Sequence, residues 1–148
     1  MCARHVGKTA NERFRVLIVD DDHQDAFFVE TALQQAGVDE IDIATSGAEA
    51  LKIIREKRHE LVILDLNLPG VTGRDVLREL KSGEERIPVP IIILSASAQR
   101  IDIDECYALH ANAYLVKPYD IETYDEIAQR LAEFWRDAAR LPRPIAAE

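Results

Sequence analysis

Long apolar runs are absent from this sequence of 148 residues. No segment approaches the roughly 18 consecutive apolar residues that a membrane-spanning helix needs. The opening stretch, MCARHVGKTANERFR, lacks the apolar centre of a secretory signal. Cysteine is scarce as well, because Cys2 and Cys106 are far apart and show no metal-ligand spacing. These absences argue against a membrane protein and a cysteine-based metal site, and we expect a cytoplasmic location.

Positive charge is also in short supply. The chain has 18 Lys and Arg against 27 Asp and Glu, a net charge of −9. Binding to nucleic acid regardless of sequence relies on Lys and Arg to neutralise phosphates, and no basic helix stands out here. We therefore expect no nucleic-acid partner. The length suits one well-buried domain and is too short for two ordinary ones.

Short apolar runs recur along the chain, and most are rich in β-branched residues. Such runs are typical of strands buried on both faces of a parallel sheet. A weaker segment, IDIA at 41–44, alternates apolar and polar residues as an edge strand does. The four stronger runs are VLIV at 16–19, LVIL at 61–64, IIIL at 91–94 and AYLV at 113–116.

Helical patterns follow each predicted strand. The first stops at Gly37, and Asp22 is predicted to cap its N-terminus rather than to bind a ligand. Two further helices open with capping boxes, Ser46-x-x-Glu49 and Thr72-x-x-Asp75. The first helix is predicted to cover 25–36, and the last two are predicted to cover 101–109 and 120–138.

The order of elements is strand then helix, five times over. Right-handed crossovers then require a parallel sheet with helices on both faces. Because the polar second strand belongs at an edge, we predict an α/β, flavodoxin-like doubly wound (βα)5 fold with strand order 2-1-3-4-5. The predicted domain covers 14–138, between an N-terminal arm at 1–13 and a C-terminal tail at 139–148.

Polar residues follow the predicted strands at the edge where such sheets bind ligands. They are Asp20 and Asp21 after the first strand, Asp65 after the third, Ser95 after the fourth and Lys117 after the fifth. Neighbouring carboxylates repel one another unless a cation lies among them, and oxygen ligands suit Mg²⁺. A carboxylate beside Mg²⁺ is also a nucleophile towards phosphorus. The pattern indicates phosphoryl chemistry at this edge.

Four motifs in one order, VLIVDDD, LVILDLNLPGVTG, IIILSA and AYLVKP, resemble the receiver domains of response regulators. The resemblance covers about residues 14–138. It implies that Asp65 is the phosphoacceptor and that Asp21 binds Mg²⁺ directly. It further implies that Asp20 acts at the metal mainly through water, and that Asn67 offers its backbone carbonyl to the metal.

The same resemblance implies a conformational switch. Ser95 and Lys117 would bind phosphoryl oxygens, and Tyr114 would rotate as Ser95 moves towards the phosphate. The bond between Lys117 and Pro118 is expected to be cis, as is usual in the family. The domain would catalyse its own phosphorylation and dephosphorylation without being a turnover enzyme.

A narrower resemblance links DLNLPGVTGRDVL, YALHANAYLVKPYD and the adjacent Phe134 and Trp135 to the small regulators paired with phytochrome-type kinases. It implies a phytochrome-type histidine kinase as partner and a homodimer formed through the predicted helix 101–109, the strand 113–116 and the helix 120–138. Adjacent residues point about 100° apart on a helix, so one of the two aromatic rings is expected to meet another subunit. A phosphotransfer or target protein would receive the output.

Three other functions fit this sequence less well. A phosphatase of the haloacid-dehalogenase kind needs an acid two residues after the nucleophile, where this chain has Asn67. A flavodoxin-like binder needs a phosphate loop rich in Gly, Thr or Ser after the first strand, and the acids stand there instead. A receiver that serves only for docking would not need the full set of acids, hydroxyl and lysine.

Overall fold

The computed structural model describes residues 13–84 and 86–142. Most of the predicted arm 1–13, part of the predicted tail 139–148 and the thiol of Cys2 lie outside the described residues. Cys106 is a buried residue of a helix, in line with the absence of a metal-ligand pattern around it.

Five parallel strands form one sheet in the order β2-β1-β3-β4-β5, which confirms the predicted topology. The polar strand β2 lies at an edge, and β1, β3 and β4 are almost entirely buried. The strand bounds are β1 Arg15–Val19, β2 Glu40–Ala44, β3 Leu61–Leu64, β4 Ile91–Ser95 and β5 Ala113–Val116.

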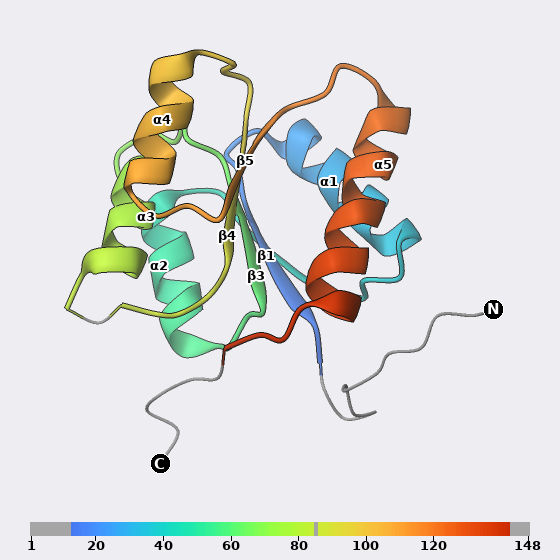
Figure 1. The fold of residues 1–148 in the computed structure, drawn as a ribbon, viewed down its shortest axis with the longest axis horizontal. Coiled ribbons are helices and arrows are strands. Elements are labelled where there is room, and N and C mark those ends of the chain that lie inside the picture. Colours follow the sequence, from blue (N-terminus) through green and yellow to red (C-terminus); the bar gives the residue numbers. More distant parts are fainter. Residues whose placement is uncertain (1–12, 85, 143–148) are drawn as a thin grey trace.

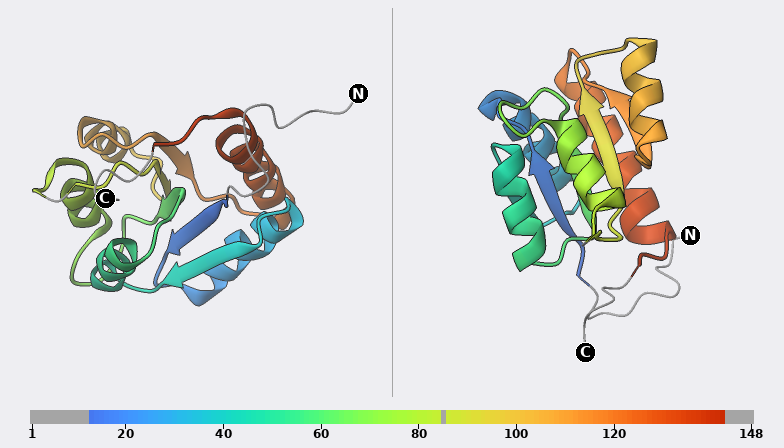
Figure 2. Two further views of the ribbon diagram at one scale, coloured as in Figure 1. Left: turned by 90° about the horizontal axis from the view of Figure 1, so that it is seen from below. Right: turned by 90° about the vertical axis from the view of Figure 1, so that its left-hand side faces the viewer.

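Helices cover both faces of the sheet, as Figure 1 and the end-on view in Figure 2 show. α1 and α5 lie on one face, and α2, α3 and α4 lie on the other. The predicted doubly wound architecture is therefore confirmed. The helix bounds are α1 His23–Gln35, α2 Gly47–Glu56, α3 Gly73–Ser82, α4 Arg100–Ala108 and α5 Ile121–Leu131.

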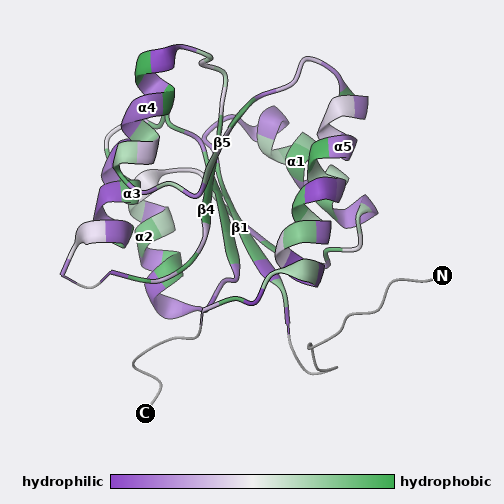
Figure 3. Ribbon diagram, viewed as in Figure 1, coloured by the Kyte–Doolittle hydropathy of each residue, from purple (hydrophilic) through white to green (hydrophobic). Residues whose placement is uncertain are grey.

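The strand residues alternate between two apolar cores. In β1, Val16 and Ile18 belong to the core under α1 and α5, and Leu17 and Val19 belong to the core under the other three helices. This is the two-residue period of a strand whose faces are both covered. Figure 3 shows the apolar strands enclosed between helices whose outer surfaces are hydrophilic.

The predicted N-caps are present, although only half of the predicted capping box at α2 forms. The Ser46 hydroxyl accepts from the Glu49 N–H, whereas the Glu49 carboxylate accepts from the N–H of Thr45 instead of completing the box. The Asp22 side chain accepts hydrogen bonds from the backbone N–H groups of Gln24 and Asp25, which confirms Asp22 as the cap of α1. Thr72 and Asp75 form a complete capping box at the start of α3. These caps satisfy N–H groups that have no partner within the helix and fix the points at which the chain leaves the sheet edge.

The predicted final helix changes its winding. α5 is followed by a π-helical segment, η1, at Ala132–Ala138, so the helical extent is close to the prediction but the geometry is not uniform. Trp135 packs against the core under α1 and α5, whereas Phe134 is 55% exposed. The two rings meet edge to face with their centroids 4.9 Å apart. One ring packs inward and the other stays on the surface, in line with the prediction that both could not be buried.

One expectation about the backbone is wrong. Within the two described ranges every peptide bond is trans, including the bond between Lys117 and Pro118. The trans form is the lower in free energy even before proline, by about 0.5–1 kcal/mol. No helix within the described ranges is long and apolar enough to cross a membrane.

Candidate functional site

The predicted site residues meet at the carboxyl edge of the sheet. Asp20 and Asp65 directly follow β1 and β3, Ser95 ends β4, and Lys117 directly follows β5. β1 and β3 are neighbours, and the backbone N–H of Asp65 donates to the carbonyl of Val19 at 3.0 Å, so the two acids are held side by side. Four strands therefore deliver these side chains to one edge of the sheet.

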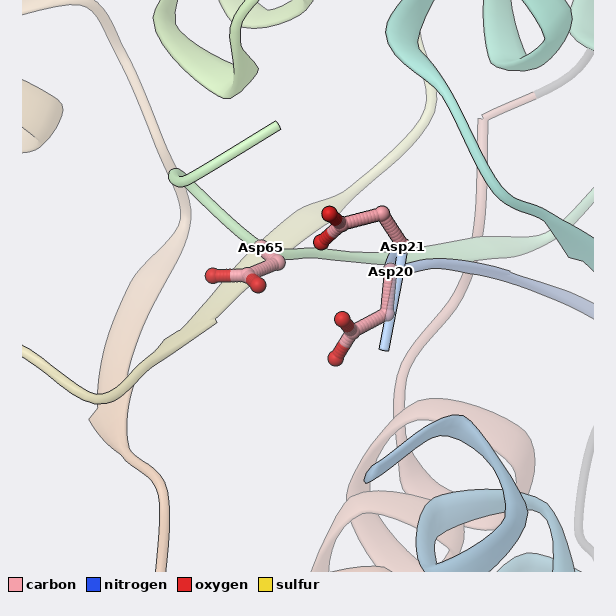
Figure 4. A group of neighbouring side chains, drawn as sticks. All are labelled: Asp20, Asp21 and Asp65. Atoms are coloured by element: carbon pink, nitrogen blue, oxygen red, sulfur yellow. The ribbon is translucent and has the colours of Figure 1, made fainter. Parts of the chain in front are cut away.

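Three carboxylates form the centre of the site. Asp20, Asp21 and Asp65 each offer an oxygen, and these oxygens lie within 4.8 Å of one another. Asp20 and Asp65 are buried, and Asp21 is exposed. Figure 4 shows the carboxylates of Asp21 and Asp65 gathered beside that of Asp20. The cluster is thus half enclosed, with one acid open to solvent.

The ammonium of Lys117 neutralises part of this charge. Its Nζ donates to Asp20 at 2.9 Å, to Asp65 at 3.2 Å and to Asp25 at 2.8 Å. The Lys117 side chain is only 11% exposed. Burial by itself would lower the pKa of Lys117, but the hydrogen bonds to Asp25 and Asp20 and the charge of Asp65 raise it above its ordinary value. The lysine is therefore firmly charged.

Burial raises the pKa of Asp20, whereas it acts to lower the pKa of Lys117. Loss of solvent raises the pKa of Asp20 to about 6, although hydrogen bonds from the Asp22 backbone N–H and from Lys117 favour the charged form. A further positive charge beside Asp20 would relieve this cost.

The residues fit a divalent cation. Clustered carboxylate oxygens are the ligands that Mg²⁺ and Mn²⁺ prefer, and the exposed Asp21 leaves room for bound water. Asp20, Asp21 and Asp65 would hold the ion. The backbone N–H of Asn67 donates to Asp65 at 3.3 Å, which places the loop after β3 beside the same carboxylate.

Ser95 and Tyr114 are connected through the loop after β4. The buried Ser95 hydroxyl accepts a hydrogen bond from the N–H of Ser97 at 3.2 Å. The Tyr114 hydroxyl donates to the carbonyl of Ser97 at 2.8 Å. The two predicted switch residues therefore hold the same residue from its two sides. Ser97 was not predicted, because a serine in a loop carries no distinctive pattern.

Two further residues near the site were missed as functional candidates. Asp25, in the first turn of α1, makes the shortest of the three contacts to Lys117. Arg74 of α3 binds the carboxylates of Asp102 and Glu105 in α4, and Asp102 also accepts a hydrogen bond from Ser97. The sequence pattern indicates only that Asp25 lies at the start of a helix, because it stands three residues after the cap Asp22.

The fold and the site together are those of a receiver domain of two-component signalling. The chain belongs to the response regulator receiver domain family, whose family model matches residues 16–129. Domains of this family are signalling proteins rather than turnover enzymes.

Relatives support the narrower resemblance. The chain is 30% identical to the response regulator Rcp1 of Synechocystis sp., with 86% of this chain and 92% of that protein covered. A crystal structure of Mn²⁺-bound Rcp1 covers 88% of this chain and 99% of its own at a TM-score of 0.79. The phosphorylated cyanobacterial phytochrome response regulator RcpA matches at 32% identity and a TM-score of 0.82, covering 89% of this chain and 100% of its own. The chemotaxis protein CheY-3 of Vibrio cholerae is 30% identical, with 83% of this chain and 95% of that protein covered.

Proposed function

We propose that this protein is a single-domain response regulator that accepts a phosphoryl group from a histidine kinase on Asp65 and then changes conformation to control a partner protein or a phosphorelay. The convergence of the Asp65 carboxylate with Asp20, Asp21 and Lys117 carries the proposal. An isolated strand-end acid would need none of these neighbours.

The transfer step follows from the positions of these groups. An oxygen of Asp65 attacks the phosphorus of phosphohistidine, the P–O bond forms and the P–N bond breaks. The electron pair leaves with the imidazole nitrogen, which takes up a proton. Lys117, whose Nζ lies 3.2 Å from Asp65, supplies positive charge for the phosphoryl oxygens. Because the product stays attached to the protein, the domain modifies itself and does not turn over.

Asp20, Asp21, Asp65 and the backbone carbonyl of Asn67 are proposed to hold Mg²⁺. When bound, the cation would neutralise charge on the transferred group. The Mn²⁺-bound form of Rcp1 supports a divalent cation in a relative of this chain. The burial of Asp20 and Asp65 supports the same assignment, because buried carboxylates this close call for more than one positive charge.

The proposed switch begins at Ser95 and ends at Tyr114. As Ser95 moves towards the phosphoryl group, its hydroxyl would release the N–H of Ser97, and Tyr114 would lose its present acceptor. The surface of α4, β5 and α5 would then repack and carry the output. The bonds that join Ser95, Ser97 and Tyr114 support this route.

We propose a phytochrome-type histidine kinase as partner, with a phosphotransfer or target protein downstream. The resemblance to RcpA, a cyanobacterial phytochrome response regulator, supports this choice. A homodimer through α4, β5 and α5 is part of the proposal, supported by exposed Ile101, Val116 and Ile121 on those elements. The proposed receiver domain spans 14–138, and a cytoplasmic location remains our expectation.

Intact-mass analysis tests the central claim. The protein is incubated with Mg²⁺ and acetyl phosphate, as wild type, as Asp65→Asn and as Asp75→Asn, which replaces an acid that caps α3 outside the site. The wild type and Asp75→Asn should each gain one phosphoryl group, and Asp65→Asn should gain none. Omitting Mg²⁺ should abolish the gain. No adduct on the wild type, together with no binding of beryllofluoride, would leave a docking module as the better description.

A further inference from the structure

Lys117 has used all of its hydrogen-bonding capacity before any phosphoryl group arrives. An ammonium has three N–H donors, and here each has a carboxylate acceptor, in Asp20, Asp25 and Asp65. Two of these acids belong to the metal cluster. Asp25 does not, and it makes the shortest of the three contacts at 2.8 Å.

Asp25 differs from the acid that occupies the same helical position elsewhere in the chain. It is the third residue of α1 after the cap Asp22, as Asp75 is the third residue of α3 after the cap Thr72. The Asp75 carboxylate turns back and accepts a hydrogen bond from the Thr72 N–H at 3.0 Å. The Asp25 carboxylate instead reaches Lys117, 92 positions away in the sequence. Capping of its own helix does not explain this orientation.

The position of Asp25 gives it a directional effect on the lysine. Asp20 and Asp65 project from the ends of β1 and β3, whereas Asp25 projects from α1, which lies on one face of the sheet. The Asp25 side chain is 30% exposed, more than those of Asp20 and Asp65. Asp25 therefore draws the ammonium towards α1 and towards solvent, away from the buried centre of the cluster.

We infer that Asp25 is a positioning residue that occupies one donor of Lys117 and keeps the ammonium, which already contacts Asp20 and Asp65, from moving deeper between them, where it would compete more strongly with a divalent cation. The inference rests on the proposed function of this site. Without the Asp25 charge, Lys117 would move closer to the two buried carboxylates that the cation needs. The ammonium would then hold the oxygens of Asp20 and Asp65 more tightly against the cation.

The test is the dissociation constant of Mg²⁺, measured by titration calorimetry on the full chain with no phosphodonor present. In Asp25→Asn, which keeps the shape and removes the charge, the constant should rise roughly three- to tenfold because the ammonium competes at close range. Asp75→Asn is the matched control, since it removes the equivalent acid of α3 and should leave Mg²⁺ binding unchanged. An unchanged constant in Asp25→Asn would overturn the inference.

A second background separates positioning from simple loss of negative charge. In Lys117→Met there is no ammonium to position, so adding Asp25→Asn should change the Mg²⁺ dissociation constant less than twofold. An equal fold-change with and without Lys117 would show that Asp25 acts only through its charge, and the inference would fail. Circular dichroism checks that each variant is folded. If Asp25→Asn does not fold, Asp25→Ser provides a second variant with a neutral side chain at this position.

Failure of this inference is distinguishable from failure of the proposed function. Mg²⁺ binding that responds to Asp25 as expected, in a protein that acetyl phosphate does not modify, would support the positioning role and reject the phosphoacceptor. Normal phosphorylation of the wild type, with Mg²⁺ binding that ignores Asp25, would do the reverse.

Discussion

The hydroxyl of Tyr114 donates a hydrogen bond of 2.8 Å to the backbone carbonyl of Ser97. The N–H of Ser97 in turn donates to the hydroxyl of Ser95. Movement of Ser95 and rotation of Tyr114 therefore act on the same residue, and the loop after β4 is the element they share.

Tyr114→Phe should loosen this loop without phosphorylation. Removing one hydrogen bond costs about 1 kcal/mol, so protection of the Ser97 amide against hydrogen exchange should fall roughly fivefold. Tyr107→Phe is the control, because the Tyr107 hydroxyl accepts from the Tyr114 backbone N–H and does not contact Ser97. Equal Ser97 protection in wild type and Tyr114→Phe would show that the loop is held by other contacts.

Asp20→Asn should stabilise the metal-free protein at neutral pH. The folded pKa of Asp20 is about 6, against an ordinary value of 3.8, so the folded state binds more protons than the unfolded state between those values. The free energy of unfolding then decreases as the pH rises from about 4 to about 6. Replacing the carboxylate by an amide should raise it by about 1–3 kcal/mol at pH 7.5 and by much less at pH 4.

Urea denaturation at the two pH values measures this difference. Asp75→Asn should lower the free energy of unfolding at pH 7.5 instead of raising it, because hydrogen bonds from the backbone and side chain of Thr72 lower the pKa of Asp75. The same Asp20 variant should bind Mg²⁺ more weakly, so function and stability would separate at this residue. A less stable Asp20→Asn at pH 7.5 would mean that the ion pair with Lys117 outweighs the cost of burial.

Gly73→Ala should destabilise the protein through the loop after β3. A Cβ at Gly73 would lie 2.3 Å from the carbonyl oxygen of Asp65 and 2.7 Å from the Cα of Leu66, both backbone atoms. Forcing them apart should cost about 3 kcal/mol in urea denaturation. Gly70→Ala is the comparison: its Cβ would meet nothing within 4 Å, but its φ of +70° leaves a cost of about 1 kcal/mol. If Gly73→Ala lowered the stability in urea no more than Gly70→Ala, the predicted clash at Gly73 would be refuted.

Phe134→Ser should weaken the proposed homodimer. Phe134 is 55% exposed in η1, the π-helical segment that continues α5, and Phe27 is 58% exposed on α1, away from the elements proposed for the interface. Sedimentation velocity across a concentration series should therefore show at least a tenfold weaker dimer for Phe134→Ser, and no change for Phe27→Ser. A wild type that stays monomeric throughout would remove the basis for this interface.

The sequence was sufficient for the strands and for most of the site, for one physical reason. Parallel strands end at the same edge, so residues directly after buried runs, such as Asp20, Asp65 and Lys117, must meet there. Asp25 could not be found in this way. An acid at the third position of a helix looks the same whether it caps its own helix, as Asp75 does, or crosses to Lys117. Only the contact between the first turn of α1 and Lys117, the residue after β5, decides between the two.

Two other features could not be predicted from sequence patterns. The trans bond at Pro118 and the expected cis form differ by a free energy too small for sequence to settle. The π-helical winding after Leu131 has no residue pattern of its own, although it helps to determine which of Phe134 and Trp135 packs inward.

Arg13 and Pro142 lie at the end of the sheet opposite the acids. Arg13 comes just before β1 and pairs with Glu40 at the start of β2, and Arg58, just before β3, contacts the carbonyl of Pro142. The four residues of β3 put about 13 Å between that end and Asp65. A surface linker, fluorophore or fusion partner attached near Arg13 or Pro142 would leave the edge of the sheet that carries the acids uncovered. A biosensor made from this protein should therefore be tethered there, with its reporter placed on α4.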